Sequence, residues 1–287
     1  MWIADNWTDY ELLDCGDGER LERWGKYTLR RPDPQAIWSS ARDRSETDID
    51  ARYLRSSNGG GKWEVYSKLP DNWRVNYDAL SFNVKLMNFK HTGLFPEQAS
   101  NWDWLRQNCD SQTNVLNLFG YTGAASLACA GAGASVCHVD AAKGIVDHAR
   151  GNQRLSGLEQ APIRWIVDDC REFVKREIRR GKRYNALIMD PPSYGRGTKG
   201  EIWKLEDDLY AFCKLCAELL ADVRFILINS YTTGLSAAVL TYIAQSIYGE
   251  RFGLNSESRE LGLRAAASGL VLPAGASCRT AKGKITE

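Results

Sequence analysis

The sequence predicts an α/β fold with a doubly wound, mostly parallel sheet, preceded by a small β-rich region. From about residue 114 onward, short apolar segments alternate with segments of helical pattern, as in repeated βα units. Before about residue 85, short strand-like segments are separated by Gly, Asp and Pro, and most of the ten tryptophans lie there. We therefore expect two domains, covering residues 1–85 and 86–287.

The composition is that of an ordinary globular protein, with 44% hydrophobic and 25% charged residues. A formal net charge of +1 creates no global field for a polyanion, although a local basic face can be balanced elsewhere. We see no secretory signal and no apolar run long enough to span a bilayer. Eight scattered cysteines favour reduced thiols in a cytoplasm. The oligomeric state stays open, a homodimer included.

In the β-rich region we expect strands over residues 10–13, 20–24, 27–30 and 62–66. The polar stretch 39–61 is interpreted as a loop, because it ends in Asn-Gly-Gly-Gly. Most tryptophans here are expected to fill a small core. The alternative is a surface for stacking and phosphate contact on RNA. The cations available for it are Lys26, Arg30, Arg31, Arg52 and Arg55.

In the second region the expected strands are 115–119, 135–139, 163–167, 186–189 and 225–228, with helices over 122–130, 142–155 and 171–179. The tail 261–273 is expected to form a closing hairpin or an edge pair of strands. A doubly wound sheet binds its ligand at the carboxyl ends of the strands. Residues that directly follow these strands are therefore the candidate site.

The first such segment is a glycine turn that opens a helix. Glycine lets the backbone turn sharply, and the helix start offers free N–H groups to a carboxylate or phosphate. A tight βα turn needs glycine even without a ligand, so the turn alone is a weak signal. Its residues are Asn117, Leu118, Phe119, Gly120, Tyr121, Thr122 and Gly123.

Acidic residues follow the second and third strands. Asp140 comes about twenty residues after the glycine turn, where an acid accepts hydrogen bonds from ribose hydroxyls; capping the next helix is the alternative. Asp169, in Asp168-Asp169-Cys170, can accept from an adenine amino group, and it can equally be a helix N-cap.

The fourth strand ends in Asp190-Pro191-Pro192-Ser193-Tyr194, the most specific local signal. The prolines fix the backbone and lack N–H donors, which leaves carbonyls to accept. An acid, rigid carbonyls and an aromatic ring suit a planar nitrogenous substrate. This segment also argues against a nicotinamide dehydrogenase.

Two further motifs are weaker. Cys213-x-x-Cys216 lies in a helical pattern without a second pair or histidine cluster, so buried thiols are a simpler interpretation than a metal or redox site. The basic run from Lys175 to Arg183 ends a predicted helix, where cations are usually solvated. Contact with RNA is the alternative for this run.

Taken in order, these motifs together with His91 to Gln98 resemble the class I methyltransferase family that includes the bacterial 23S ribosomal RNA methyltransferases of the I and K/L types. The resemblance covers about residues 80–287 and implies a Rossmann-like domain with a mostly parallel seven-stranded sheet and bound S-adenosylmethionine. It implies that Phe95, Gln98 and the 117–123 turn hold the methionine end, Asp140 with Ala141 the ribose, Asp169 with Cys170 the adenine, and Asp190 a place beside the cofactor.

One departure from the family bears on mechanism. Cytosine-C5 members place a cysteine nucleophile after the fifth strand, whereas this sequence has Thr232 at that position. An unactivated threonine cannot readily add to a pyrimidine ring. We therefore expect direct methyl transfer to a base nitrogen in RNA, ribosomal RNA above all. Asp190, Pro191 and Pro192 would position the target and Tyr194 would stack on it. The alternatives are a protein or small-molecule substrate, and a non-catalytic ribosome assembly factor that binds S-adenosylmethionine or RNA.

Overall fold

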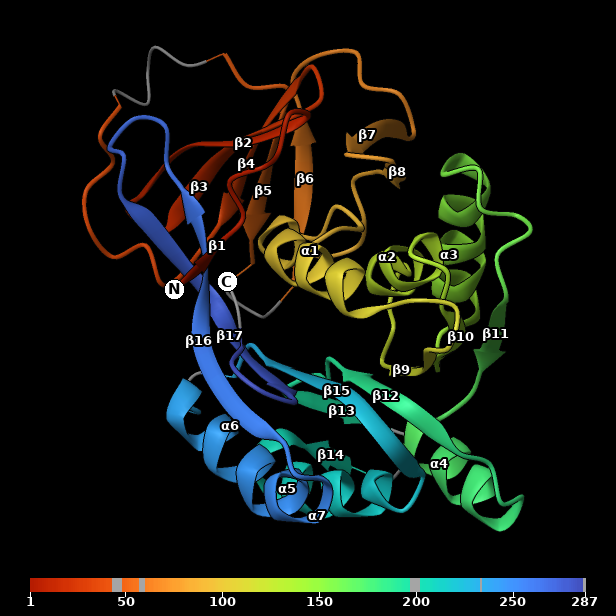
Figure 1. Cartoon of the computed structure of the whole chain (residues 1–287). Helices are drawn as coiled ribbons and strands as arrows, with labels where there is room; N and C mark the ends of the chain where they lie inside the picture. Colours follow the sequence, from red (N-terminus) through yellow and green to blue (C-terminus); the bar gives the residue numbers. More distant parts are fainter. Residues whose placement is uncertain (43–47, 57–59, 197–201, 233, 286–287) are drawn as a thin grey trace. The chain divides into compact units, whose positions relative to one another are not determined.

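The computed structural model describes residues 1–42, 48–56, 60–196, 202–232 and 234–285 (Figure 1). The chain divides into two compact units. A β-rich unit comprises residues 3–100 and 262–274, and an α/β unit comprises residues 1–2, 101–261 and 275–287. The expected domain boundary near residue 85 stays a prediction. No helix in the described ranges is long and apolar enough to cross a membrane.

The β-rich unit is built on a five-stranded sheet of order β2-β3-β4-β5-β6. Its strands are β2 (Tyr10–Gly16), β3 (Glu19–Trp24), β4 (Tyr27–Pro32), β5 (Ala51–Arg55) and β6 (Gly61–Val65). A separate hairpin pairs β7 (Trp73–Tyr77) with β8 (Leu80–Val84). The four strands expected in this region are present as β2, β3, β4 and β6.

The expectation that residues 39–61 form a loop is wrong for Ala51–Arg55, which is strand β5. This strand runs parallel to β4 through Leu29 and Ala51, and antiparallel to β6. Ala51 and Tyr53 are buried, Arg52 and Leu54 are half-buried, and Arg55 is exposed. Only two residues carry the apolar alternation, which is too few to stand out in a sequence rich in arginine and aspartate. Residues 43–47 and 57–59 lie outside the described residues.

The tryptophans of the β-rich unit mainly pack. Trp24 is fully buried, and its carbonyl oxygen accepts a hydrogen bond of 3.0 Å from the indole Nε1 of Trp73, which is also buried. Trp38 is 41% exposed, and its indole donates to the Cys15 carbonyl. Packing, which the sequence favoured over an RNA surface for most of these rings, is confirmed for Trp24 and Trp73.

The large sheet has the order β1-β16-β17-β15-β12-β9-β10-β11. The strands β15, β12, β9, β10 and β11 are parallel neighbours, and β17 is antiparallel to β15. The sheet therefore has the seven strands expected and, within the described residues, a short edge strand, β1. Their bounds are β1 (Trp2–Ile3), β9 (Asn114–Leu118), β10 (Ser135–Asp140), β11 (Ile163–Val167), β12 (Tyr184–Met189), β15 (Leu220–Ser230), β16 (Asn255–Arg264) and β17 (Val271–Ala281).

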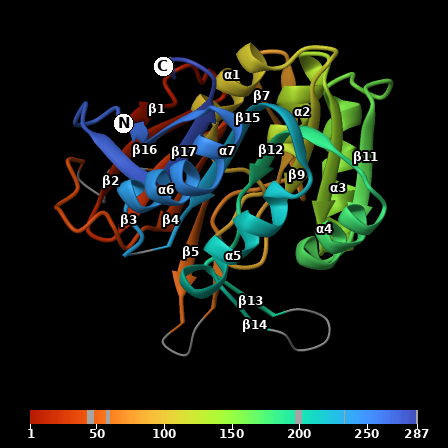
Figure 2. The same ribbon diagram turned by 60° about the horizontal axis from the view of Figure 1, so that its bottom comes forward.

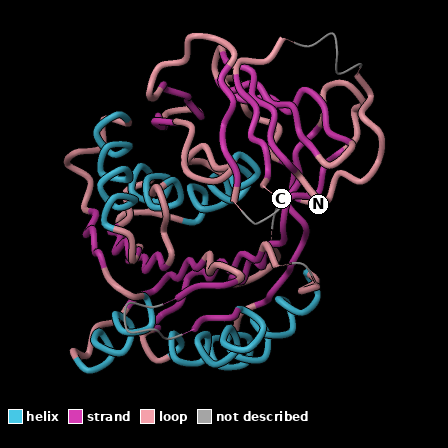
Figure 3. Tube along the Cα trace, turned by 180° about the vertical axis from the view of Figure 1, so that it is seen from behind, coloured by secondary structure: helices cyan, strands magenta, loops and turns pink. Residues whose placement is uncertain are grey.

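Helices cover both faces of this sheet, as Figures 1 and 3 show, so the doubly wound prediction is confirmed. Consecutive residues of a strand point to opposite faces and so contribute to two cores. Leu116 and Leu187 pack into one core, and Val115 and Ile188 pack into the other. A small hairpin, β13 (Tyr194–Arg196) with β14 (Ile202–Lys204), follows β12 (Figure 2). The helices are α1 (Ala99–Asn108), α2 (Ala124–Gly131), α3 (Lys143–Leu155), α4 (Cys170–Arg179), α5 (Leu205–Ala217), α6 (Ala237–Ala244) and α7 (Glu250–Phe252), with a 3₁₀ turn at Pro96–Gln98 and a π-helical turn at Gln245–Gly249.

Candidate active site

The turn after β9 has an unusual backbone. Phe119, Tyr121 and Gly123 have positive φ angles of 55°, 51° and 89°, in the left-handed region that disfavours non-glycine residues. Between them, a Cβ atom on Gly120 would lie 2.4 Å from Cε1 of His138, a buried side chain of β10. Glycine is therefore required there because the turn packs directly against His138, and the residues on either side of it, Phe119 and Tyr121, are strained.

Polar side chains behind the turn brace it from within. The buried Asn117 amide donates to Ser126 Oγ at 2.8 Å, and Ser126 Oγ lies 2.9 Å from His138 Nδ1. The Asn152 amide donates to the Thr122 carbonyl at 2.9 Å. Because the Asn117 side chain bonds inside the unit, a contact from this residue to a ligand would use its backbone.

Asp140, at the end of β10, is joined to the same turn. Its Oδ2 accepts from the Tyr121 N–H and its Oδ1 from the Ala142 N–H, both at 3.0 Å. Burial raises the pKa of this carboxyl group above its ordinary value. Each carboxylate oxygen retains a lone pair, so two hydroxyl donors can still be accepted. Ala141, directly after it, is exposed.

Asp169 is the N-cap of α4, and its side chain accepts from the Glu172 N–H at 3.0 Å. The capping role considered from sequence is thus present. The next residue, Cys170, is buried, and its sulfur accepts a hydrogen bond of 3.2 Å from the Phe119 N–H. Cys170 thereby connects the end of β11 to the turn after β9.

The Asp-Pro-Pro-Ser-Tyr segment lies at the end of β12, next to β9. The Asp190 N–H donates to the Leu118 carbonyl at 3.4 Å, and the Pro192 carbonyl accepts from Trp203 Nε1 at 2.7 Å. The Pro192 oxygen therefore has one lone pair left for a ligand. Tyr194 begins β13 and is 51% exposed.

An aromatic cluster links this segment to the turn after β9. The rings of Phe119, Trp203 and Phe212 have centroids 5.6 to 5.9 Å apart. The Arg171 guanidinium lies 5.4 Å from the Trp203 ring. Trp203 lies outside any sequence motif, and only the pairing of β14 with β13 brings it to this segment.

Phe95 and Gln98 lie in the β-rich unit, Phe95 directly before the 3₁₀ turn and Gln98 as its last residue. Phe95 is the residue that caps this turn, and its carbonyl accepts from the Gln98 N–H at 3.1 Å. The Trp7 indole donates to the Pro96 carbonyl at 2.9 Å. Glu97 and Gln98 are buried. This segment is held rigidly within its unit.

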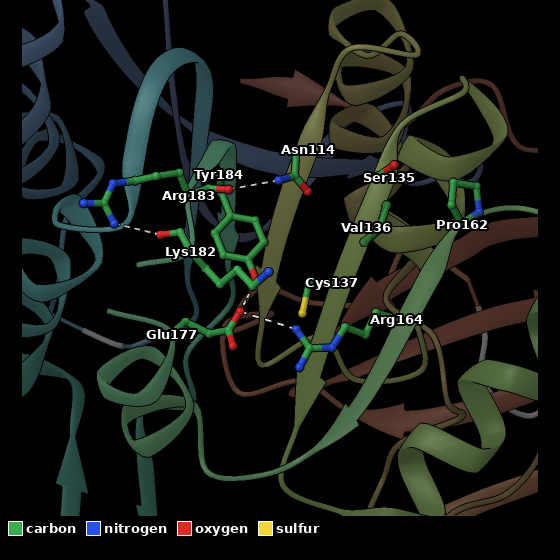
Figure 4. A pocket seen from close by; sticks show the side chains of 10 residues that line it. All are labelled: Asn114, Ser135, Val136, Cys137, Pro162, Arg164, Glu177, Lys182, Arg183 and Tyr184. Carbon is green, nitrogen blue, oxygen red and sulfur yellow. Dashed lines mark hydrogen bonds and ion pairs between the residues drawn. The ribbon is translucent and has the colours of Figure 1, made fainter. Parts of the chain in front are cut away.

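A pocket of about 200 Å³ lies at the opposite end of the sheet, where β9, β10 and β12 begin (Figure 4). The buried Glu177 carboxylate accepts from the Tyr184 hydroxyl at 2.8 Å and pairs with Arg164 and Arg180. Because the acid in this pocket is already satisfied by these groups, and the ligand end of a parallel sheet is the other edge, we do not assign the cofactor here. The lining residues are Asn114, Ser135, Val136, Cys137, Pro162, Arg164, Glu177, Lys182, Arg183 and Tyr184.

Cys213 and Cys216 are both fully buried in the core beside α5. Burial raises the pKa of each thiol, which keeps it protonated and unreactive. The described residues contain no group of three or more His, Cys, Asp or Glu side chains that could hold a metal ion.

A doubly wound α/β unit, with an acid at the end of its second strand facing a strained glycine turn, defines a class of enzyme that binds a nucleoside-containing cofactor. The family model for S-adenosylmethionine-dependent methyltransferases matches residues 19–228. The chain belongs to this family, and its cofactor is S-adenosylmethionine.

Solved structures agree with this assignment. A methyltransferase from Agrobacterium tumefaciens, described as S-adenosylmethionine-dependent, is 36% identical with a TM-score of 0.90 over 98% of this chain and 93% of its own. A second protein, crystallised with S-adenosylhomocysteine, is 20% identical with a TM-score of 0.76 over 97% of this chain and 76% of its own, and shows the shared fold.

Curated relatives are more distant. Ribosomal RNA large subunit methyltransferase K of Neisseria meningitidis is 24% identical over 72% of this chain. Ribosomal RNA large subunit methyltransferase K/L of Pseudoalteromonas atlantica is 28% identical over 56% of this chain. The matched parts span 61% and 23% of those two relatives.

Proposed function

We propose that this methyltransferase acts on a base nitrogen in RNA, with ribosomal RNA as the substrate, by direct transfer. The observation that carries the proposal is the Asp190–Tyr194 segment beside the turn after β9, with an exposed aromatic ring at its end. The curated relatives that match this chain are ribosomal RNA methyltransferases by name, which favours RNA over a protein or small molecule. A ribosomal substrate would also place the enzyme in the cytoplasm.

The residues around the turn after β9 fit the cofactor. Gly120 has no side chain, which lets the turn pack directly against His138, and Asp140 keeps two lone pairs suited to the two ribose hydroxyls. Asp169, with the Cys170 backbone, would bind the adenine. Phe95, Gln98 and the turn backbone would bind the methionine end. S-adenosylmethionine, when bound, supplies a methyl group already activated on a sulfonium.

The chain's part in the reaction is to orient the target and exclude water. Asp190 would hold the target nitrogen through a hydrogen bond and take up its proton. Pro191 and the free lone pair of Pro192 would accept from the exocyclic amino group, and Tyr194 would stack on the ring. Trp203 holds the Pro192 carbonyl in place, so the acceptor is already oriented before the base arrives.

Covalent catalysis by a thiolate has no support at this site. Thr232 follows β15 at the position where cytosine-C5 enzymes of the family carry cysteine, and its hydroxyl donates to Ser193 Oγ. Cys170, whose sulfur accepts a hydrogen bond from the Phe119 N–H in the turn after β9, is buried, and burial raises its pKa. A protonated buried thiol is a poor nucleophile.

The test is methyl incorporation from radiolabelled S-adenosylmethionine into RNA, protein and metabolite fractions from cells that lack this gene. Label in large ribosomal RNA is expected, and nuclease mapping then locates the base. Label confined to protein or metabolites would refute the RNA assignment. Binding of the RNA substrate should also weaken steeply with salt, because displaced counterions accompany phosphate contacts.

A further inference from the structure

Phe89 is an exposed aromatic residue in a strained conformation on the β-rich unit. Its side chain is 62% exposed, and its φ of 61° places it in the left-handed region, which is uncommon for a bulky residue. It lies at the tip of a turn whose arms are joined by hydrogen bonds from Met87 N–H to the His91 carbonyl and from Lys85 N–H to the Thr92 carbonyl. Strain and exposed apolar area both cost stability, and such residues concentrate at functional sites.

The turn is held in this shape by the neighbouring sheet. The indole Nε1 of Trp63, on β6, donates to the carbonyls of Met87 and Phe89 at 2.9 and 3.1 Å. The Arg31 guanidinium donates to the Lys90 carbonyl, and Lys90 Nζ donates to the Pro32 carbonyl, both at 3.0 Å. Phe89 is therefore presented by a fixed backbone, which lowers the entropy cost of using its ring for binding.

Cations lie on this turn and on the neighbouring sheet. Arg55 is paired in register with Gly61 and so shares the sheet face of Tyr53 and Trp63, the face toward the turn. Arg55 is exposed and has no ion pair with any described residue, and the same holds for Lys85. Burial and the nearby charges of Arg20, Arg31 and Arg55 lower the pKa of Lys90 to about 8, while Asp33 opposes them. Arg55 and Lys85 thus add positive charge on the unit that presents the exposed ring.

We propose that Phe89, with Arg55 and Lys85, forms a contact surface for a single-stranded segment of RNA. The ring would stack on a base and the cations would pair with adjacent phosphates, a combination that proteins use for single strands without strict sequence preference. The inference rests on the proposed RNA substrate and adds a second contact, outside the methyl-transfer site. Phe89 lies six residues before Phe95, so the chain itself keeps the surface within about 20 Å of the segment assigned to the cofactor.

The test compares Phe89→Asn with the parent full-length protein. Asparagine tolerates the left-handed backbone, so this change removes the ring without adding strain, and the urea midpoint should be unchanged or raised. Binding of a fluorescein-labelled single-stranded oligoribonucleotide, measured by anisotropy, should weaken about tenfold. Phe89→Tyr should retain binding. Tyr242→Ala is the control, because Tyr242 is 75% exposed on α6, a helix without charged residues in its end turns.

Two further variants test the contribution of positive charge to RNA binding. Arg55→Ala should reduce the dependence of log affinity on log salt by about 0.7, the contribution of one phosphate in a single strand. Lys62→Ala should leave it unchanged, because Lys62 lies on the opposite face of β6 from Trp63. Parent-like RNA affinity of Phe89→Asn would overturn the inference, even if RNA methylation proceeds. Absence of RNA methylation in the incorporation assay would instead count against the proposed function.

Discussion

The hydroxyl of Thr232 donates a hydrogen bond of 2.7 Å to Ser193 Oγ. Thr232 follows β15 and Ser193 follows β12, so the bond ties together the ends of two neighbouring parallel strands. The residue that stands in place of a cysteine nucleophile thus has a structural partner inside the Asp-Pro-Pro-Ser-Tyr segment. We infer that it positions this segment.

Thr232→Val should lower kcat for methyl transfer about two- to tenfold, because one hydrogen bond that orients the segment is lost while side-chain shape is kept. The dissociation constant for S-adenosylmethionine, measured by calorimetry, should not change. Thr241→Val is a matched control, since Thr241 Oγ1 makes an equivalent bond of 2.7 Å to Ser258 Oγ on another part of the sheet. An unchanged kcat in Thr232→Val would exclude the positioning role.

Asp190→Ala should abolish methyl transfer with little loss of cofactor affinity, because the acid is assigned to the target nitrogen. Single-turnover transfer of radiolabel and cofactor binding are the two measurements. Asp147→Ala, on the exposed side of α3, serves as the control and should retain full activity. Normal activity of Asp190→Ala would refute the assignment.

Gly120→Ala should destabilise the protein by about 1–3 kcal/mol through overpacking. The added Cβ would lie 2.4 and 2.5 Å from Cε1 and Nδ1 of His138, a ring held between Ser126 and Trp165. Chemical denaturation measures the change. Gly144→Ala is the comparison: its Cβ would meet nothing within 4 Å on α3, and alanine favours the helix. Equal stability of the two variants would show that the turn after β9 can move away from His138.

His138 should make stability depend on pH. Burial lowers the pKa of its imidazole to about 3, so the folded protein keeps the ring neutral while the unfolded chain binds a proton below about pH 6.5. The contribution is therefore fully present above pH 6.5 and is lost as pH falls toward 3. Between pH 7 and pH 5, wild type should lose about 2 kcal/mol of unfolding free energy relative to His138→Asn. Comparing the two proteins at each pH cancels the contributions of the other titrating groups. A difference in unfolding free energy that does not change with pH would contradict the prediction.

Much of the α/β unit could be predicted because its signals are local. Ile163–Val167 forms β11 with the expected bounds, and the expected hairpin in the tail is present as β16 and β17. The position of Asp140 beside the turn after β9 followed from strand spacing alone, because consecutive parallel strands end at the same edge of a sheet. Strand β5 was missed because its pairing with β4 and β6, and not its composition, makes it a strand.

The sequence by itself determined the family, the sheet and the acids that end its strands, since apolar periodicity and turn residues act over a few neighbours. Only the tertiary structure decided that Trp203 holds the Pro192 carbonyl and that Thr232 bonds to Ser193, 39 residues away. It also decided that Trp63 shapes the turn carrying Phe89. Such contacts join residues far apart in the chain, and their geometry depends on how whole elements pack, which no local pattern encodes.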